Sequence, residues 1–318
     1  MPQEAETLHS GVAATYKARE VEGVLDLRFY RPIGFRLAEF FAQLRMTPAS
    51  VSLLAGICGV FAGHLYFYRD LRVNIIGMVM HVCANALDNA DGQLARLTHR
   101  ESRNGRIIDS IADHCVFASV YIHLALRCVF ESGSPSVWLL ALGAAISHTL
   151  QGAAADYYRN TFLYFANGAR TEIDSASALR SDYRKLRWDQ KPWDKLLLAL
   201  YLNFTLQQEI LAPHLKKLRE TGNAVFHGQI PGWLRQRYRD AASGMLKPWG
   251  VLMTNARMLV LFLLLLIGQP VYYFWFELIP LNVLFIYLIV RQEKMAESLE
   301  QVVTAKSRAK RTRERSSC

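Results

Sequence analysis

The feature that most constrains this chain is a series of apolar stretches, each close to the length needed to cross a lipid bilayer. A hydrocarbon core of about 30 Å is crossed by roughly 20 apolar residues in a helix. Runs such as Leu259–Ile267 leave no polar face, which argues against the buried helices of a soluble protein. The pattern predicts an all-α, polytopic membrane helix bundle of about six transmembrane helices. The stretches are Val51–Tyr68, Val73–Leu87, Ile107–Leu126, Val137–Ala155, Met258–Phe274 and Trp275–Val290, the last two joined by a tight hairpin near Gln269–Trp275.

Composition excludes two other classes of protein. Of the 318 residues, 52% are apolar, which is too many for an intrinsically disordered chain. The five cysteines form an odd set without a CxxC pair, so a secreted disulfide scaffold is excluded as well. No nucleic-acid partner is expected. The apolar surface of the protein is expected to contact the lipid bilayer.

The distribution of positive charge predicts the orientation. The net charge is +10, but the predicted outer loops carry only Arg69, Arg72 and Arg127. Positive residues concentrate on the cytosolic side of membrane proteins. We therefore expect a multi-pass protein of the cell (inner) membrane with both termini in the cytosol. No signal peptide is visible in the first 26 residues, which hold several charges and no apolar core.

The segments outside the spans complete the predicted organisation. Pro32–Leu44 places Phe35, Leu37 and Phe41 at helical spacing, which indicates an amphipathic helix lying in the inner interface. In the long inner insertion, an apolar helix over Trp193–Leu211 is expected on the membrane surface. The tail after Arg291 is expected to be solvated and disordered. The predicted divisions are an N-terminal cytosolic segment (1–29), the interfacial helix and first four spans (30–160), the insertion (161–250), the last two spans (251–291) and a basic cytosolic tail (292–318).

Four carboxylates lie at the predicted membrane boundary, where a charged side chain is energetically unfavourable. Asp88 and Asp91 are three residues apart at the inner end of the second span, and Asp109 and Asp113 are four apart at the start of the third. Each pair therefore projects from one face of its helix. Carboxylates at the membrane boundary need a neutralising partner. Hard oxygen ligands suit Mg²⁺, Mn²⁺ or Ca²⁺, so the acids predict one divalent cation or a pair of them.

Small and basic residues accompany these acids. Gly92, Ala95 and Gly105 clear helix surface for a ligand, and the planar fork of Arg96 matches phosphate oxygens. Metal, fork and free space together indicate a site for a nucleotide diphosphate. Two alternatives remain open at this point. Acids near span ends also serve as solvated capping residues, and intramembrane acids also relay ions or protons in transporters.

The combined spacing D-x2-D-G-x2-A-R-x8-G-x3-D-x3-D resembles the signature of the CDP-alcohol phosphatidyltransferase family. Its eight positions are Asp88, Asp91, Gly92, Ala95, Arg96, Gly105, Asp109 and Asp113. Members of this family transfer the phosphate of a CDP-linked alcohol to another hydroxyl and release CMP. The resemblance implies that Asp88, Asp91 and Asp109 hold the metal and that Asp113 completes the metal site and acts as the catalytic base. It also implies two Mg²⁺ or Mn²⁺ ions as cofactors.

The resemblance further implies which residues bind the CDP substrate. Gly92 and Arg96 would contact the CDP group, with Ala95 and Gly105 leaving room for it and Ser102 often touching it. The segment Thr47–Ser52 looks like the family's T-P-[DN]-x-V-T lead into the first span, with Ala49 in place of Asp or Asn and Ser52 in place of Thr. The resemblance implies that Ser52 can supply the hydroxyl that the family places at the nucleotide.

The sequence constrains the substrates less than it constrains the metal-binding and CDP-binding residues. We expect transfer of a phosphatidyl group from CDP-diacylglycerol to a polar polyol, such as inositol or inositol phosphate, at the cytosolic side. The alternatives are a CDP-choline or CDP-ethanolamine phosphotransferase acting on a diradylglycerol and, more remotely, an ion- or proton-coupled transporter. Candidates for binding the acceptor are Arg159, Arg170 and Arg257, and Arg159 is preferred because it ends a span. A homodimer is left open, because family members often pair through their spans.

Overall fold

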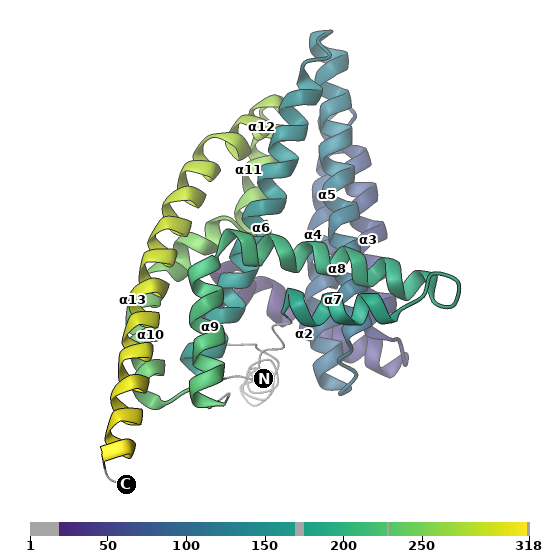
Figure 1. Cartoon of the computed structure of the whole chain (residues 1–318). Helices are drawn as coiled ribbons and strands as arrows, with labels where there is room; N and C mark the ends of the chain where they lie inside the picture. Colours follow the sequence, from purple (N-terminus) through teal and green to yellow (C-terminus); the bar gives the residue numbers. More distant parts are fainter. Residues whose placement is uncertain (1–18, 169–174, 228, 317–318) are drawn as a thin grey trace, which may run out of the picture. The chain divides into compact units, whose positions relative to one another are not determined.

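The computed structural model describes residues 19–168, 175–227 and 229–316, and all regular structure in these residues is helical (Figure 1). Two short turns, η1 (Arg19–Val21) and η2 (Asp26–Tyr30), come first. The helices are α2 (Arg31–Gln43), α3 (Pro48–Leu65), α4 (Leu71–Leu97), α5 (Arg103–Ser132), α6 (Val137–Asn167), α7 (Ala176–Lys185), α8 (Pro192–Leu211), α9 (Pro213–Phe226), α10 (Gly232–Val251), α11 (Thr254–Leu266), α12 (Val271–Leu278) and α13 (Pro280–Ser316).

Five helical segments among the described residues are long and apolar enough to cross a membrane. They are Pro48–Leu65, Asn104–Ser132, Val137–Ala166, Gly232–Leu266 and Val271–Ser307. The predicted all-α polytopic bundle is thereby confirmed. The predicted second span lies in α4, which has 27 residues. This helix is long enough at about 1.5 Å per residue, but Asp88 and Asp91 make its inner half too polar to count among the five.

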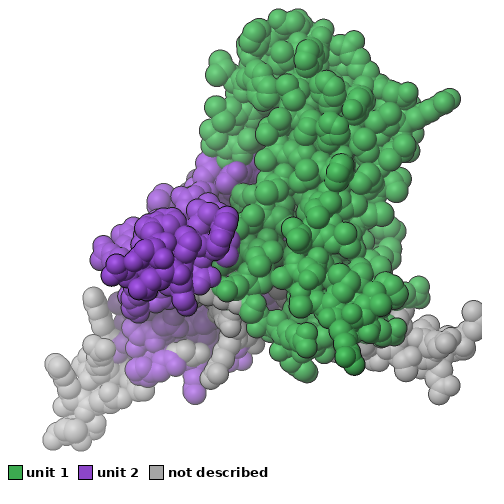
Figure 2. Space-filling view, turned by 90° about the vertical axis from the view of Figure 1, so that its right-hand side faces the viewer, with its two compact units in different colours: residues 1–147, 254–279 green, residues 148–253, 280–318 purple. Residues whose placement is uncertain are grey.

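The chain divides into two compact units, shown in different colours in Figure 2. Unit 1 comprises residues 1–147 and 254–279, and unit 2 comprises residues 148–253 and 280–318. The four acids singled out in the sequence all belong to unit 1.

Close packing of α3 against α4 and α5 organises unit 1. A Cβ atom on Gly56 would lie 2.9 Å from that of Ala112, and one on Gly63 would lie 2.8 Å from the backbone nitrogen of Val120. Glycine at these positions therefore lets α3 and α5 approach backbone to backbone, as small residues do between membrane helices. A buried core of unit 1 includes Tyr66, Leu124, Leu261, Leu265 and Phe274, and it packs α5 against α11 and α12.

Helix α2 coincides with the predicted amphipathic helix. Its buried face places Ala38 and Phe41 against Ala90 and Leu94 of α4. The opposite face exposes apolar side chains, with Phe40 53% exposed. This exposed apolar face suits the predicted position of α2 at the membrane surface.

Unit 2 is built on aromatic packing around α6, α9, α10 and α13. The Tyr158 ring stacks on Trp249 with 5.3 Å between centroids, and its hydroxyl donates to the backbone oxygen of Ala242. Phe165 stacks on Tyr238 in the same way. Helices α7 and α8 lie side by side (Figure 1), and α8 coincides with the predicted helix over Trp193–Leu211.

The prediction of a disordered tail after Arg291 was wrong. Helix α13 continues to Ser316, and Ala296, Leu299 and Val303 on it are buried. Glu293 accepts hydrogen bonds from the first backbone N–H groups of α9, at 2.6 Å from His214. The tail carries apolar residues every three or four positions among its charges, and this stripe packs on α9.

The predicted hairpin between the last two spans was also misplaced. The chain breaks earlier, between Leu266 and Val271, where Gly268 adopts a φ of 69°. A second break at Ile279 separates the short helix α12 from α13. Pro270 and Pro280 start the next helices, because proline is tolerated at a helix start and disrupts a helix interior.

Candidate active site

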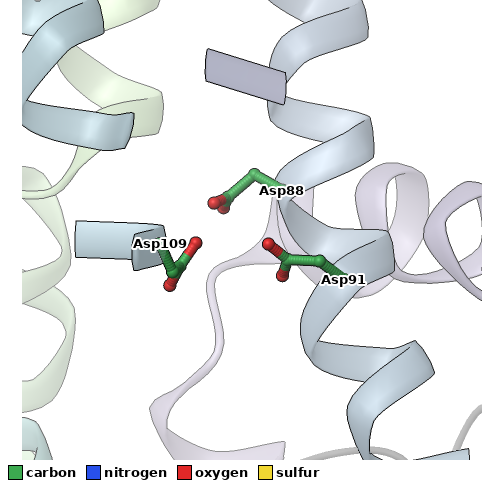
Figure 3. A group of neighbouring side chains, drawn as sticks. All are labelled: Asp88, Asp91 and Asp109. Carbon is green, nitrogen blue, oxygen red and sulfur yellow. The ribbon is translucent and has the colours of Figure 1, made fainter. Parts of the chain in front are cut away.

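Three of the four predicted acids converge on one point in unit 1. Asp88 and Asp91 project from α4 toward Asp109 of α5 (Figure 3). One carboxylate oxygen from each of the three lies within 4.8 Å of the others. Asp91 is buried and the other two are partly buried. Three carboxylates this close repel one another unless a cation lies among them.

Local structure explains the convergence. Asp91 lies six residues before Leu97, the end of α4, and Asp109 lies six residues after Arg103, the start of α5. The connection between the helices is short, so Asp91 and Asp109 lie equally far from it along their two helices. His99 takes a φ of 52° to end α4, and Ser102 caps α5 by accepting a hydrogen bond from the Gly105 N–H at 3.0 Å.

Helix α3 contributes Ser52 to the same site. The Ser52 hydroxyl donates a hydrogen bond to Oδ2 of Asp91 and is 3% exposed. The predicted hydroxyl of the first span therefore lies beside the acids. Its hydrogen bond fixes the orientation of the most buried carboxylate.

Asp113 occupies a different position from the other three acids. It lines a cavity together with Asp88, and it is not among the carboxylates whose oxygens converge. Its side chain is exposed to the space of that cavity. Asp88, Asp91 and Asp109 thus form a convergent triad, and Asp113 faces the adjacent cavity.

Arg96 and Gly92 form the cationic side of the site. A Cβ atom on Gly92 would lie 3.5 Å from a terminal nitrogen of Arg96, so the guanidinium lies directly over the bare glycine. The Nε of Arg96 is buried and has no hydrogen-bond partner among the described residues. A planar fork with unused donors beside a cluster of acids is suited to a phosphate that a metal ion also binds.

The remaining residues expected at the CDP group lie around the connection between α4 and α5. Ser102 is the helix cap described above, and Gly105 donates to it. Ala95 is half-buried, and its backbone oxygen accepts the Arg100 N–H at 2.9 Å, which closes the end of α4. Each of the three therefore has a clear local role in shaping the site's rim.

The arginines considered for the acceptor have different surroundings. Arg159 belongs to unit 2, where it pairs with Asp156 at 3.1 Å. Arg257, in unit 1, is 3% exposed and pairs with Glu277, which is fully buried. Arg257 is thus committed to an ion pair inside the helix bundle. Arg170 lies outside the described residues.

The donor set fits a divalent cation. The triad offers only carboxylate oxygens, which are the ligands that Mg²⁺ and Mn²⁺ prefer. The bare surface at Gly92 and the unused Arg96 Nε lie next to it, where phosphates that share the ion would bind. The residues present therefore suit an ion together with an anionic ligand.

Sequence reasoning missed part of the cavity beside Asp113. Its lining includes His81 and Asn85 from α4 and Thr254 from the start of α11. Asn85 lies one turn before Asp88 on the same helix, so helical spacing contained a signal for it. Thr254 is far along the chain, and no spacing rule connects it to the acids.

Comparison with known proteins finds a family match over the segment that contains this site. A sequence model described as CDP-alcohol phosphatidyltransferase matches residues 45–161, which include α3 to α5 and most of α6. A protein named bifunctional IPC transferase and DIPP synthase, from Thermococcus kodakarensis, is 24% identical over 141 residues. That match covers 44% of this chain and 31% of the relative, so the chain spans about a third of the relative's length. No solved structure matches the chain.

The matched segment contains the acid triad, Asp113, Ser52, Gly92 and Arg96. Within that segment, the structure brings Asp88, Asp91 and Asp109 together. By this match, residues 45–161 form a CDP-alcohol phosphatidyltransferase domain, and the family that the model describes consists of transferases that act on CDP-linked substrates and alcohol acceptors.

Proposed function

We propose that the protein transfers a phosphatidyl group from CDP-diacylglycerol to the hydroxyl of a polar polyol and releases CMP, as a step in phospholipid synthesis. The observation that carries the proposal is the convergence of Asp88, Asp91 and Asp109 beside Arg96 and the bare Gly92. A transporter would have no use for that glycine surface. The curated relative is itself named a transferase and synthase.

In the proposed mechanism, the triad Asp88, Asp91 and Asp109 would hold Mg²⁺ or Mn²⁺, with two ions proposed. The metal would supply positive charge that stabilises the donor's two phosphates and the charge that develops on the leaving CMP. Arg96 binds a phosphate oxygen through its fork, and Gly92 leaves the helix surface free for the nucleotide. Ser52 keeps Asp91 oriented.

Asp113 acts as the general base. The acceptor hydroxyl gives its proton to Asp113 while its oxygen forms a bond to the phosphorus next to the lipid, and the bond from that phosphorus to CMP breaks. Asp113 suits this role because it faces the cavity and its oxygens are not among those that converge on the metal point.

Two features support the assignment of the lipid to the donor: the exposed apolar face of α2, and the exposed arginines Arg100 and Arg106 near the acids. The exposed apolar face of α2 suits the acyl chains of a membrane-bound donor. Arg100 and Arg106 are exposed near the connection that carries the acids, where a soluble acceptor would arrive.

The site is proposed to face the cytosol in the cell's inner membrane, which follows from the distribution of arginine and lysine. Labelling of single cysteines in whole cells tests this. A cysteine at Ser134, in the loop between α5 and α6, should react with an impermeant maleimide, and one at His99 should react only after lysis. The reverse pattern would put the acids on the wrong side for cytosolic nucleotides.

The function is tested with purified protein and Mg²⁺. CDP-diacylglycerol or CDP-choline is supplied, each with a panel of alcohols, and CMP is measured. The proposal expects CMP from CDP-diacylglycerol with a polyol. CMP only from CDP-choline with diacylglycerol would reverse the roles of the substrates, and absence of CMP from every combination would refute the transferase.

A further inference from the structure

We infer that the acceptor alcohol of this enzyme carries no phosphate group, and that it binds in the cavity beside Asp113. This inference rests on the proposed function and narrows its acceptor, which the sequence left open between a free and a phosphorylated polyol. We call this space the acceptor cavity. It is enclosed by α3, α4, α5 and α11, all of which belong to unit 1.

Position is the first argument. The acceptor cavity touches Asp88 of the metal triad and Asp113, the proposed base, at the same time. A hydroxyl inside it therefore reaches both the acid that takes its proton and the edge of the site that binds the donor's phosphates. Arg96 and Gly92, which form the donor's side of the site, are not among the residues that line it.

Charge is the second argument. The only formally charged residues that line the acceptor cavity within the described part of the chain are Asp88 and Asp113. The nearest arginine along α11 is Arg257, one turn after Thr254, and it is bound to Glu277. A metal ion at the triad would be shared between Asp88 and the donor's phosphates, so a second phosphate in this space would meet the Asp113 carboxylate and no side-chain cation. Placing like charges together in a low-dielectric site is strongly unfavourable.

The uncharged groups of the lining show what does fit. Ser52, His81, Asn85 and Thr254 offer hydrogen-bonding atoms, and the His81 ring is held by the Tyr66 hydroxyl, 3.1 Å from Nδ1. Between them, the walls are small or apolar side chains such as Ala84, Val116 and Phe117. Such a lining binds hydroxyl groups and C–H surface, as the polar and apolar faces of a neutral alcohol require.

The packing of the walls limits the size of the acceptor. Gly56 faces Ala112 across the α3–α5 contact, so the backbones cannot separate without loss of that contact. Ala84 is 6% exposed and has the smallest side chain that α4 contributes to the lining. A larger residue at Ala84 would therefore fill the acceptor cavity and leave the donor's side unchanged.

The test compares matched acceptors and matched variants of the full-length protein in detergent with CDP-diacylglycerol and Mg²⁺. The acceptors are glycerol against sn-glycerol 3-phosphate and myo-inositol against inositol 1-phosphate, followed by release of CMP. The variants are Ala84→Leu, which fills the acceptor cavity, and Cys83→Leu, which makes a larger side chain at an exposed neighbour. Binding of CDP-diacylglycerol is measured separately by calorimetry.

We expect the uncharged member of at least one pair to react at least about tenfold more efficiently than its phosphate. Ala84→Leu should raise the KM for that acceptor about tenfold or more, with donor binding changed less than about threefold, and Cys83→Leu should behave as the wild type. Preference for the phosphorylated member, or an unchanged acceptor KM in Ala84→Leu, would overturn the inference and leave the transferase intact. Absence of CMP with every acceptor would overturn both, and donor binding would then show whether the nucleotide site itself had failed.

Discussion

Ser52 of α3 donates its hydroxyl hydrogen to the carboxylate of Asp91 on α4, so the first span of the matched domain directly orients an acid of the candidate metal site. Both side chains are buried, at 3% and 6% exposed. The contact explains why a hydroxyl residue belongs at the start of α3. It also gives the first prediction.

Replacing Ser52 with Ala should lower the apparent Mg²⁺ affinity by about tenfold or more, because groups that orient metal ligands typically contribute 10–100-fold. Ser52→Thr keeps a hydroxyl and should restore most of that affinity. The measurement is the Mg²⁺ dependence of CMP release. Ser50→Ala is the control, since Ser50 is exposed and bonds only locally to Thr47. Equal Mg²⁺ dependence in Ser52→Ala and the wild type would show that the contact has no part in the site.

Gly92 should tolerate a methyl group and reject a large side chain. A Cβ atom would meet Arg96 at 3.5 Å, an ordinary contact distance, so Gly92→Ala should retain measurable turnover. Gly92→Leu would fill the surface proposed for the nucleotide, and CMP release should fall below about 1% of wild type, a loss of roughly 2.7 kcal/mol or more of transition-state stabilisation. Gel filtration and thermal unfolding establish that the variant is folded. Full activity in a folded Gly92→Leu variant would exclude a nucleotide on this face of α4.

Asp113 and Asp88 should fail in different ways. Asp113→Asn removes the proposed base, so turnover should be lost while CDP-diacylglycerol binding in Mg²⁺ stays within about tenfold, or about 1.4 kcal/mol. Asp88→Asn removes a ligand of the triad and should weaken metal and nucleotide binding together. Calorimetry on both variants separates the two effects. Equal loss of binding in both would identify Asp113 as a metal ligand and place the base elsewhere.

The convergence of three of the acids could be predicted from the sequence because it depends on local geometry. Two helices joined by a short connection, each with two acids on one face, bring Asp91 and Asp109 to equal depth without information from the rest of the chain. The structure places Asp113 beside a cavity and outside the converging set of carboxylates. The residues that α3 and α11 contribute to that cavity could not be read from the spacing along α5.

The parts that could not be predicted depend on distant packing. Thr254 reaches the acceptor cavity because α11 returns to unit 1 after residues 148–253, the first segment of unit 2. The tail is rich in charged residues, so its apolar stripe was not recognised from the sequence. The structure shows that this stripe belongs to a helix packed against α9. Composition alone favoured a solvated end, and the periodicity of Ala296, Leu299 and Val303 was the better guide.

The packed tail gives a prediction about stability. Val303 is fully buried, so Val303→Asp would place an unpaired carboxylate in the contact between α13 and α9 and should cost on the order of 3 kcal/mol or more. Gln301→Asp changes an exposed position on the same helix and should be nearly neutral. Thermal unfolding and limited proteolysis of the purified protein compare the two. Equal stability of both variants would mean that the end of α13 does not pack in solution.

The central claim is that Asp88, Asp91 and Asp109 hold a divalent cation that in turn binds the CDP group. Its most direct test is a titration of purified protein with Mn²⁺, followed by electron paramagnetic resonance of the free ion, with and without CMP. The account predicts saturable Mn²⁺ binding in the wild type that CMP strengthens, and loss of that binding in a folded variant carrying Asp88→Asn, Asp91→Asn and Asp109→Asn. Unchanged Mn²⁺ binding in the triple variant would contradict it.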